Sequence, residues 1–198
     1  RSRGADTLRA MRALVVTNFA PDASAPQRGR WIEDQVGELR RLGVAVELFV
    51  FPPGKRHYLP ATLRLRRLLR RERFSLVHAH YGLVGWCARL ASARPLVVSF
   101  HGTDVRHRLV GSLSRRLATR VDLVAAVSRA LFETEDGRPG LPPVAGSAVL
   151  PCGADLERFR PMPREEARGR LGLRPDGRYL LFPANPSRPE KRHDRASE

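Results

Sequence analysis

The sequence predicts an α/β protein built on a doubly wound parallel sheet, for three reasons. Short apolar segments alternate along the chain with segments that carry apolar residues at helical spacing. The apolar segments are continuously hydrophobic, as expected for strands that helices cover on both faces of a sheet. Hydrophobic residues make up 42% of the 198 positions, which is enough to bury a core. Strands and helices that alternate in this way favour parallel pairing with right-handed crossovers.

The first strand is expected at residues 12–18, a buried segment with apolar residues at its centre. The loop that follows ends at Gly29, and the apolar side chains of residues 30–42 then recur at helical spacing. Residues 44–51 form the second strand, which two prolines and a glycine stop. The remaining expected elements are helices at 60–73, 83–93, 111–120 and 129–135, and strands at 76–80, 95–100, 122–127 and 147–150.

The domain organisation follows from changes in composition. Residues 1–10 are polar and basic and predict a disordered lead-in, and residues 11–150 form the first domain. Four prolines punctuate residues 151–178, which therefore predict an interdomain linker with a short helix at 164–171. Residues 179–198 begin with an apolar strand, 179–183, that cannot bury its own faces. We therefore expect a two-domain protein that is cut off just after its second domain begins.

The net charge of +16 and the isoelectric point near 11.5 leave three classes of partner open. They fit a nucleic-acid binder, a protein on anionic lipid, or an enzyme for anionic substrates. Of the 36 basic residues only Lys55 and Lys191 are lysines, so a general arginine bias is a further explanation.

No apolar run approaches the roughly 18 residues that span a bilayer. The apolar run Ala13–Val16 behind the N-terminal arginines is too short for a signal peptide, so we place the chain in the cytoplasm. Cys87 and Cys152 agree with that compartment, since they are too few for a disulfide scaffold and lack zinc-ligand spacing.

Three common sites are missing from the loops where they would stand. The loop after the first strand lacks the glycine pattern of a dinucleotide site, and the chain has neither a P-loop nor a nucleophile elbow. These absences exclude dehydrogenases, nucleoside triphosphatases and ordinary hydrolases. The informative loops are those that follow strands, because ligands bind outside the carboxyl ends of strands in open α/β sheets.

Two of these loops predict contacts with anions or hydroxyl groups. Arg28 and Gly29 lie where the first helix begins, and a helix N-terminus with a glycine permits close approach of a phosphate. In Ser99-Phe-His-Gly-Thr-Asp104, His101 stands at the carboxyl end of a strand and could bond a sugar hydroxyl or a phosphate. A simple turn, capped by Thr103 or Asp104, is the alternative.

The other two loops are Val77-His-Ala-His-Tyr-Gly82 and residues 186–192. His78 and His80 occupy alternate strand positions and face the same side, but no third metal ligand is evident. One satisfied core histidine beside one cleft-facing histidine is the simpler interpretation. Arg188, Lys191 and Arg192 form either a diphosphate site or a solvated charge run.

Taken in order, these segments resemble a known family. The order is a strand-1 loop ending in glycine, VHAHYG, VVSFHGTD, AAVS, VLPCGADLERFRP and an arginine/lysine loop. It resembles the N-terminal half of a family-4 retaining glycosyltransferase of the GT-B fold over about residues 11–195. The resemblance implies two Rossmann-like domains across a cleft, with acceptor bound mainly by the first and nucleotide sugar mainly by the second, and no metal or other cofactor.

The resemblance also implies roles for particular residues. Gly29 would approach the donor phosphates, His101 would act catalytically near the transferred sugar, and Lys191 would neutralise the leaving diphosphate. The residues expected to line the acceptor cleft are Arg28, His80, Tyr81, Gly102, Thr103 and Asp104.

The chain departs from the family pattern at several points. Pro186 stands where the family has an arginine, and Arg188 is the nearest substitute as a phosphate ligand. Cys152 replaces a common asparagine in the linker motif. The E-x7-E motif of the second domain is absent, so the chain alone is expected to be a poor catalyst. The expected reaction is sugar transfer from a nucleotide sugar to a hydroxyl of a sugar or lipid-linked acceptor, with retention.

A basic segment, residues 59–74, combines a leucine stripe with many arginines. Such helices bind anionic membranes, so peripheral contact with the inner membrane face is one interpretation; a sheet-covering helix with solvated arginines is the other. Two alternative functions are a sugar-nucleotide epimerase or phosphorylase of the same fold, and a basic nucleic-acid-binding module. The chain lacks a nucleic-acid-binding signature, so we expect no nucleic-acid partner. An inactive product of a truncated or frame-shifted gene is a third alternative.

Overall fold

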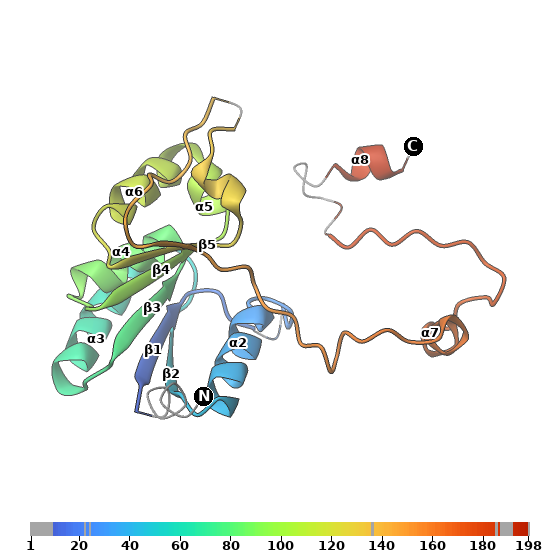
Figure 1. The fold of residues 1–198 in the computed structure, drawn as a ribbon, viewed down its shortest axis with the longest axis horizontal. Coiled ribbons are helices and arrows are strands. Elements are labelled where there is room, and N and C mark those ends of the chain that lie inside the picture. The colour runs from blue at the N-terminus through green and yellow to red at the C-terminus, as the bar shows by residue number, and fades with distance from the viewer. Residues whose placement is uncertain are drawn as a thin grey trace. The chain divides into compact units, whose positions relative to one another are not determined.

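The computed structural model describes residues 10–21, 23, 25–135, 137–184, 186 and 192–197 (Figure 1). The chain divides into two compact units, Arg1–Asp155 and Leu156–Glu198, which we describe separately. Unit 1 contains the sheet, its helices and the loops on which the candidate site stands.

Unit 1 is built on a six-stranded sheet in the order β2-β1-β3-β4-β5-β6, with every neighbouring pair parallel. The strands are β1 (Arg12–Thr17), β2 (Ala45–Val50), β3 (Leu76–His80), β4 (Leu96–Phe100), β5 (Leu123–Ala126) and β6 (Ser147–Val149). This arrangement confirms the predicted doubly wound parallel sheet. The strand order reverses between β1 and β3, and such a reversal opens a crevice at the carboxyl ends of the strands.

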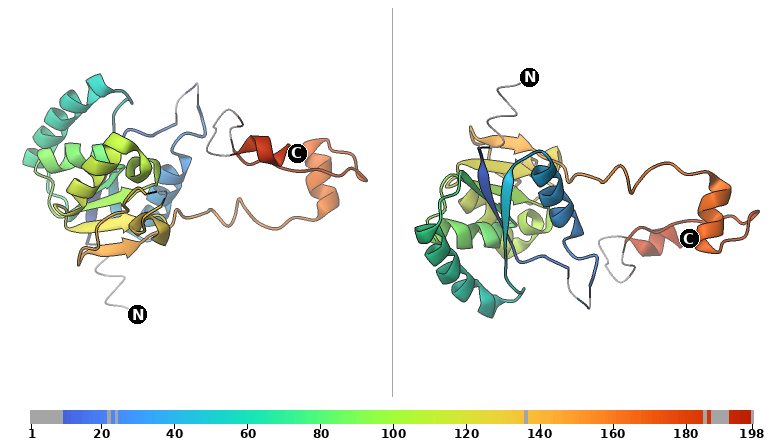
Figure 2. Two further views of the ribbon diagram at one scale, coloured as in Figure 1. Left: turned by 90° about the horizontal axis from the view of Figure 1, so that it is seen from above. Right: turned by 90° about the horizontal axis from the view of Figure 1, so that it is seen from below.

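The helices of unit 1 lie on both faces of the sheet (Figures 1 and 2). They are α2 (Arg30–Arg41), α3 (Tyr58–Arg71), α4 (Gly82–Leu90), α5 (Thr103–Arg106) and α6 (Arg108–Ala118), with 3-10 turns η1 (Lys55–His57) and η2 (Arg129–Phe132). The short helix α5 was not expected from the sequence. The helix expected at 129–135 is only the turn η2, because Glu133 is extended and ends it.

The two faces of the sheet have separate cores. On one face α2 packs through Ile32 and Val36 against Ala13, Val15 and Val46. On the other face α3, α4 and α6 cover a larger core that contains the buried residues listed next. These include Leu14, Val16, Ala61, Leu65, Val84, Ala88, Val98, Phe100 and Leu117. The leucine stripe of α3 is therefore only partly a core face, since Leu65 is buried while Leu63 is 46% exposed.

Two glycines inside helices allow a matched test of this packing. A Cβ atom on Gly111 in α6 would stand 2.2 Å from the carbonyl oxygen of Val105, whereas a Cβ atom on Gly37 in α2 would meet nothing within 4 Å. We expect Gly111→Ala to lower the free energy of unfolding by about 1–3 kcal/mol, because backbone atoms must move. Gly37→Ala is expected to raise it by about 0.5–1 kcal/mol, because alanine favours the helix. Urea unfolding measures both, and changes of the same sign would contradict the packing.

Unit 2 contains α7 (Arg164–Leu171), as the sequence predicts, and α8 (His193–Ala196). The prediction of a strand at 179–183 is wrong, because the backbone there has no regular secondary structure. Leu180 is 97% exposed and Leu181 is 87% exposed. A strand needs a neighbour to satisfy its N–H and C=O groups, and the described part of unit 2 supplies no second strand.

Candidate active site

An aromatic cluster stands at the carboxyl ends of β1, β3 and β4. The His101 ring follows β4 and lies 4.4 Å from the Trp31 ring of α2, centroid to centroid. On another side it stacks on Tyr81, which follows β3, at 5.0 Å and an interplanar angle of 23°. Phe19, which follows β1, lies 6.0 Å from Tyr81. The fold thus brings His101 and Tyr81 together, because they follow β4 and β3, which are parallel neighbours in the sheet.

A chain of histidines lies beneath this cluster. His78 Nε2 lies 2.8 Å from Ser99 Oγ, and His80 Nδ1 lies 3.3 Å from His101 Nε2. The rings of His78 and His80 are 4.3 Å apart, which confirms that both face the same side of the sheet. His80 is only 1% exposed, so the expectation that it lines the cleft is wrong. The ring supports His101 from below instead, because Trp31 and His101 cover it.

Burial keeps these histidines neutral. It lowers the pKa of His78 to about 4 and that of His101 to about 4, the latter with help from His78. Burial also lowers the pKa of His80 well below its usual value, with charge repulsion from His78 and His101 added. Among the described residues, no hydrogen-bond partner meets His80 Nε2. At neutral pH the site therefore presents His101 as an uncharged imidazole, which can donate or accept a hydrogen bond.

Asp104 fastens two of the loops together. Its Oδ1 atom accepts hydrogen bonds from the backbone N–H groups of His101, at 2.9 Å, and Gly102, at 3.0 Å. Its Oδ2 atom accepts one from the N–H of Gly82, at 3.0 Å. Burial raises the pKa of this carboxyl, and the backbone donors oppose that rise. Asp104 is 3% exposed, and its main effect is to fix His101 relative to the start of α4.

A cavity of about 290 Å³ opens beside the cluster. Its lining includes Tyr81, Thr103 and Asp104, which the sequence placed at the cleft. The other lining residues are Asn18, Phe19, Tyr58, Leu83, His107 and Val110. These residues were not expected at the cleft, although Asn18 is the last residue of a predicted strand. The Asn18 side-chain amide donates to the Tyr58 hydroxyl at 3.0 Å, which ties the β1 loop to the start of α3.

Tyr81 holds its place at the cost of an unusual backbone conformation. Its φ of 80° lies where side chains other than glycine are rare. Such a residue costs about 1–3 kcal/mol, and residues of this kind cluster at ligand sites. Its ring contacts His101 and Phe19, so the strained turn sets an aromatic wall between the histidine and the cavity.

Gly29 directly precedes α2, in a left-handed conformation with φ 65°. A Cβ atom there would stand 2.0 Å from the carbonyl oxygen of Phe19, so only glycine fits. Arg28 is half-buried in the same turn, where its N–H donates to the Ala25 carbonyl. Arg28, Gly29, His101 and Gly102 do not line the cavity, and His101 lies behind Tyr81, which does. Gly29 nevertheless stands two residues before Trp31, which contacts His101.

The model of the family described as Glycosyltransferase Family 4 matches residues 5–158. The chain belongs to glycosyltransferase family 4. This family 4 chain is 34% identical over 140 residues to a D-inositol 3-phosphate glycosyltransferase of Thermobispora bispora, covering 63% of this chain and 32% of that protein. It is 26% identical over 228 residues to TuaC of Bacillus subtilis, a protein named as a teichuronic acid biosynthesis glycosyltransferase without that activity being established. This match covers 87% of this chain and 58% of TuaC.

A solved structure shares the fold of this family 4 chain. The crystal structure of Anabaena HepE in complex with UDP and glucose matches with a TM-score of 0.52 at 19% identity. The match covers 82% of this chain and 50% of HepE. The chain spans 58% or less of the length of the two curated relatives above. The fold is thus that of a GT-B glycosyltransferase domain, in agreement with the predicted Rossmann-like sheet.

Some expected functional residues of the family 4 chain lie outside the described residues, namely Arg188 and Lys191. The part of the chain that the structure describes holds no group of three or more His, Cys, Asp or Glu side chains arranged to bind a metal ion. In that same part, no helix has the length and hydropathy to cross a membrane.

Proposed function

We propose that this chain is the acceptor-side half of a retaining glycosyltransferase that transfers a sugar from a nucleotide sugar to an acceptor hydroxyl. The observation that carries the proposal is the position of His101, held between Trp31 and Tyr81 where β4 ends. Family membership and the names of the relatives support it. HepE, which shares the fold, was crystallised with UDP and glucose.

His101 is the residue that we assign to the reacting sugar. One ring nitrogen, Nε2, faces His80, so Nδ1 is the atom available to a sugar hydroxyl. The ring is neutral at pH 7, because burial lowers its pKa to about 4. A neutral donor or acceptor held rigidly near the reacting carbon needs no reorganisation during the reaction.

The remaining roles divide between acceptor and donor. Tyr81, Thr103 and Asp104 line the cavity that would receive the acceptor, and Arg28 and Gly102 lie in the adjoining turns. Gly29 would approach the donor diphosphate from the N-terminus of α2, where backbone N–H groups favour an anion. Arg188 and Lys191 would neutralise the leaving nucleotide diphosphate, so that the reaction needs neither a metal nor another cofactor.

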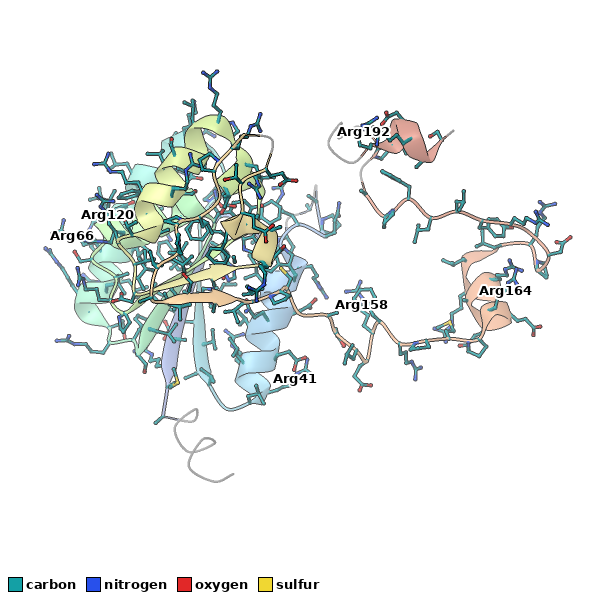
Figure 3. The ribbon with its side chains drawn as sticks, turned by 45° about the horizontal axis from the view of Figure 1, so that its top comes forward. Arg41, Arg66, Arg120, Arg158, Arg164 and Arg192 are labelled. Carbon is teal, nitrogen blue, oxygen red and sulfur yellow. The ribbon has the colours of Figure 1, made fainter. Side chains whose placement is uncertain are left out.

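We also propose a membrane-facing side for the protein, at the cytoplasmic face. The helix α3 exposes Arg64, Arg66, Arg67, Arg70 and Arg71. The label for Arg66 in Figure 3 marks a side chain that projects outward from unit 1. Arginines spaced along one exposed helix favour contact with anionic lipid headgroups. The chain by itself would be inactive, since the donor is bound mainly by a second domain in the proposed enzyme.

The test of this function is His101→Ala in a version of the protein extended by the second domain. We expect turnover to fall at least about tenfold, because one hydrogen bond to the reacting sugar is lost. His57→Ala is the control, since His57 lies in η1 and its ring nitrogen accepts a hydrogen bond from Arg56 rather than from a residue of the histidine cluster. Product analysis by NMR reports whether the anomeric configuration is retained. Unchanged turnover of the His101 variant would remove the assigned role.

A further inference from the structure

A second hollow adjoins the cavity of the candidate site. It has a volume of about 740 Å³ and runs between α3 and α6 over α4, which packs against both of them. We call it the α3–α6 groove. Its lining residues are Lys55, Tyr58, Leu59, Thr62, Leu83, Trp86, Cys87, Leu90, Leu113, Arg116 and Arg120. Tyr58 and Leu83 line both hollows, so the groove begins where the cavity ends.

The groove is apolar and open to solvent. Three of the leucines that line it are exposed to solvent: Leu59 is 70% exposed, Leu90 is 62% exposed and Leu113 is 43% exposed. Trp86 lines the same groove, with its indole N–H donating to the Leu113 carbonyl at 3.0 Å. Contiguous apolar surface of this kind on a folded domain marks a binding site rather than ordinary surface.

Cations stand at both ends of the groove. Lys55 belongs to the turn just before Tyr58 and so lies at the cavity end. Arg116 and Arg120 lie at the other end, where α6 finishes, and Figure 3 shows Arg120 projecting outward. Within the described ranges, none of these three cations forms an ion pair with a carboxylate. The groove therefore combines an apolar lining with positive charges that form no ion pair, and this combination complements an anionic amphiphile.

We infer that the α3–α6 groove holds the hydrocarbon chain of a lipid phosphate, and that this lipid is the acceptor. The inference rests on the proposed function. The polar end of the lipid carries the accepting hydroxyl and would lie in the cavity beside Tyr81, with its phosphate beside Lys55 and its chain along Leu59, Leu90 and Trp86. The hydroxyl oxygen bonds to the anomeric carbon of the sugar as the bond from that carbon to the nucleoside diphosphate breaks, and the departing diphosphate takes up the hydroxyl proton. The chain leaves the groove beside Arg116 and Arg120, whose charges face the anionic headgroups of the membrane that supplies the lipid.

The test uses the 198-residue chain and three probes. Dodecyl phosphate below its micellar concentration carries both features, inorganic phosphate lacks the chain, and dodecyl maltoside lacks the charge. Calorimetric titration is expected to show the tightest binding for dodecyl phosphate. Lys55→Gln is expected to weaken dodecyl phosphate binding several-fold and to leave dodecyl maltoside binding unchanged.

Leu90→Glu is expected to weaken dodecyl phosphate binding at least tenfold, because it places a carboxylate against the chain. Leu42→Glu is its matched control, since Leu42 is also 62% exposed but follows α2 on the other face. Leu59→Glu repeats the test at the cavity end. Both groove leucines are exposed, so urea unfolding is expected to show folded variants.

Three results would overturn the inference. The first is equal binding by Leu90→Glu and Leu42→Glu, and the second is equal binding of inorganic phosphate and dodecyl phosphate. The third is that Leu90→Glu loses binding to vesicles of anionic lipid but binds monomeric dodecyl phosphate as the unmodified chain does. That result would make the groove a membrane contact only. Absence of sugar transfer by the unmodified protein extended by the second domain, with the groove results as expected, would instead refute the proposed function and leave the lipid site in place.

Discussion

Replacing Asp104 with alanine is expected to lower the free energy of unfolding by about 2–4 kcal/mol. The reason is that three backbone N–H groups, those of Gly82, His101 and Gly102, lose their acceptor. The carboxylate is almost completely buried, so water cannot easily replace it. The His101 turn is then released from α4, and the pKa of His101, followed by NMR, should rise from about 4 toward its usual range.

Two further variants make this result specific. Asp104→Asn keeps one carbonyl oxygen as an acceptor and is expected to cost less than the alanine variant. Asp122→Ala is the comparison, because the exposed Asp122 carboxylate accepts one backbone N–H, that of Leu96, at 2.8 Å. We expect about 1 kcal/mol or less there. Equal losses for Asp104→Ala and Asp122→Ala, with the pKa of His101 unmoved, would show that Asp104 does not fasten the site.

Acidification from pH 6.5 to 4.5 is expected to lower the free energy of unfolding by on the order of 5 kcal/mol. The unfolded chain protonates its histidines near pH 6.5. The folded chain holds His78 and His101 neutral down to about pH 4, and His80 lower still. In this window the unfolded state binds more protons, so stability rises with pH and falls as acid is added. Asp104 acts in the opposite direction, because its raised pKa lets the folded state take up its proton first.

Urea unfolding at several pH values measures this slope. His78→Gln can still bond Ser99 but cannot titrate, so its stability should depend less steeply on pH. Leu65→Ala is the control, since it removes a fully buried side chain and leaves every histidine in place. It should lower stability by a similar amount at each pH. A His78→Gln slope equal to that of the unmodified chain would refute the assignment of neutral buried histidines.

Much of the fold was predictable because the strands are buried on both faces and read as continuous apolar runs. Periodicity likewise placed α2 to within one residue, and the expected short helix at 164–171 agrees with α7. The prediction failed at residues 179–183, where an equally apolar run has no strand to pair with. Apolar character predicts a strand only when a neighbour is present, and the local sequence does not contain that neighbour.

The candidate site was predictable as a place but not as a set of contacts. His101 and Tyr81 follow strands that are neighbours in the sheet, so parallel topology brings them together. The burial of His80 was not predictable, because Trp31 covers His80 from a helix far away in the sequence. The link between Asn18 and Tyr58 was missed for the same reason, since it joins residues 40 positions apart.

The backbone of Tyr81 shows what this domain gives up to keep its site in order. A glycine at position 81 would adopt a φ of 80° without strain, and the turn would gain stability. It would also remove the ring that flanks His101 and walls the cavity. The native residue therefore exchanges conformational stability for a fixed aromatic surface. Replacing Tyr81 with glycine is therefore a simple way to stabilise the domain, and the same replacement removes part of the site.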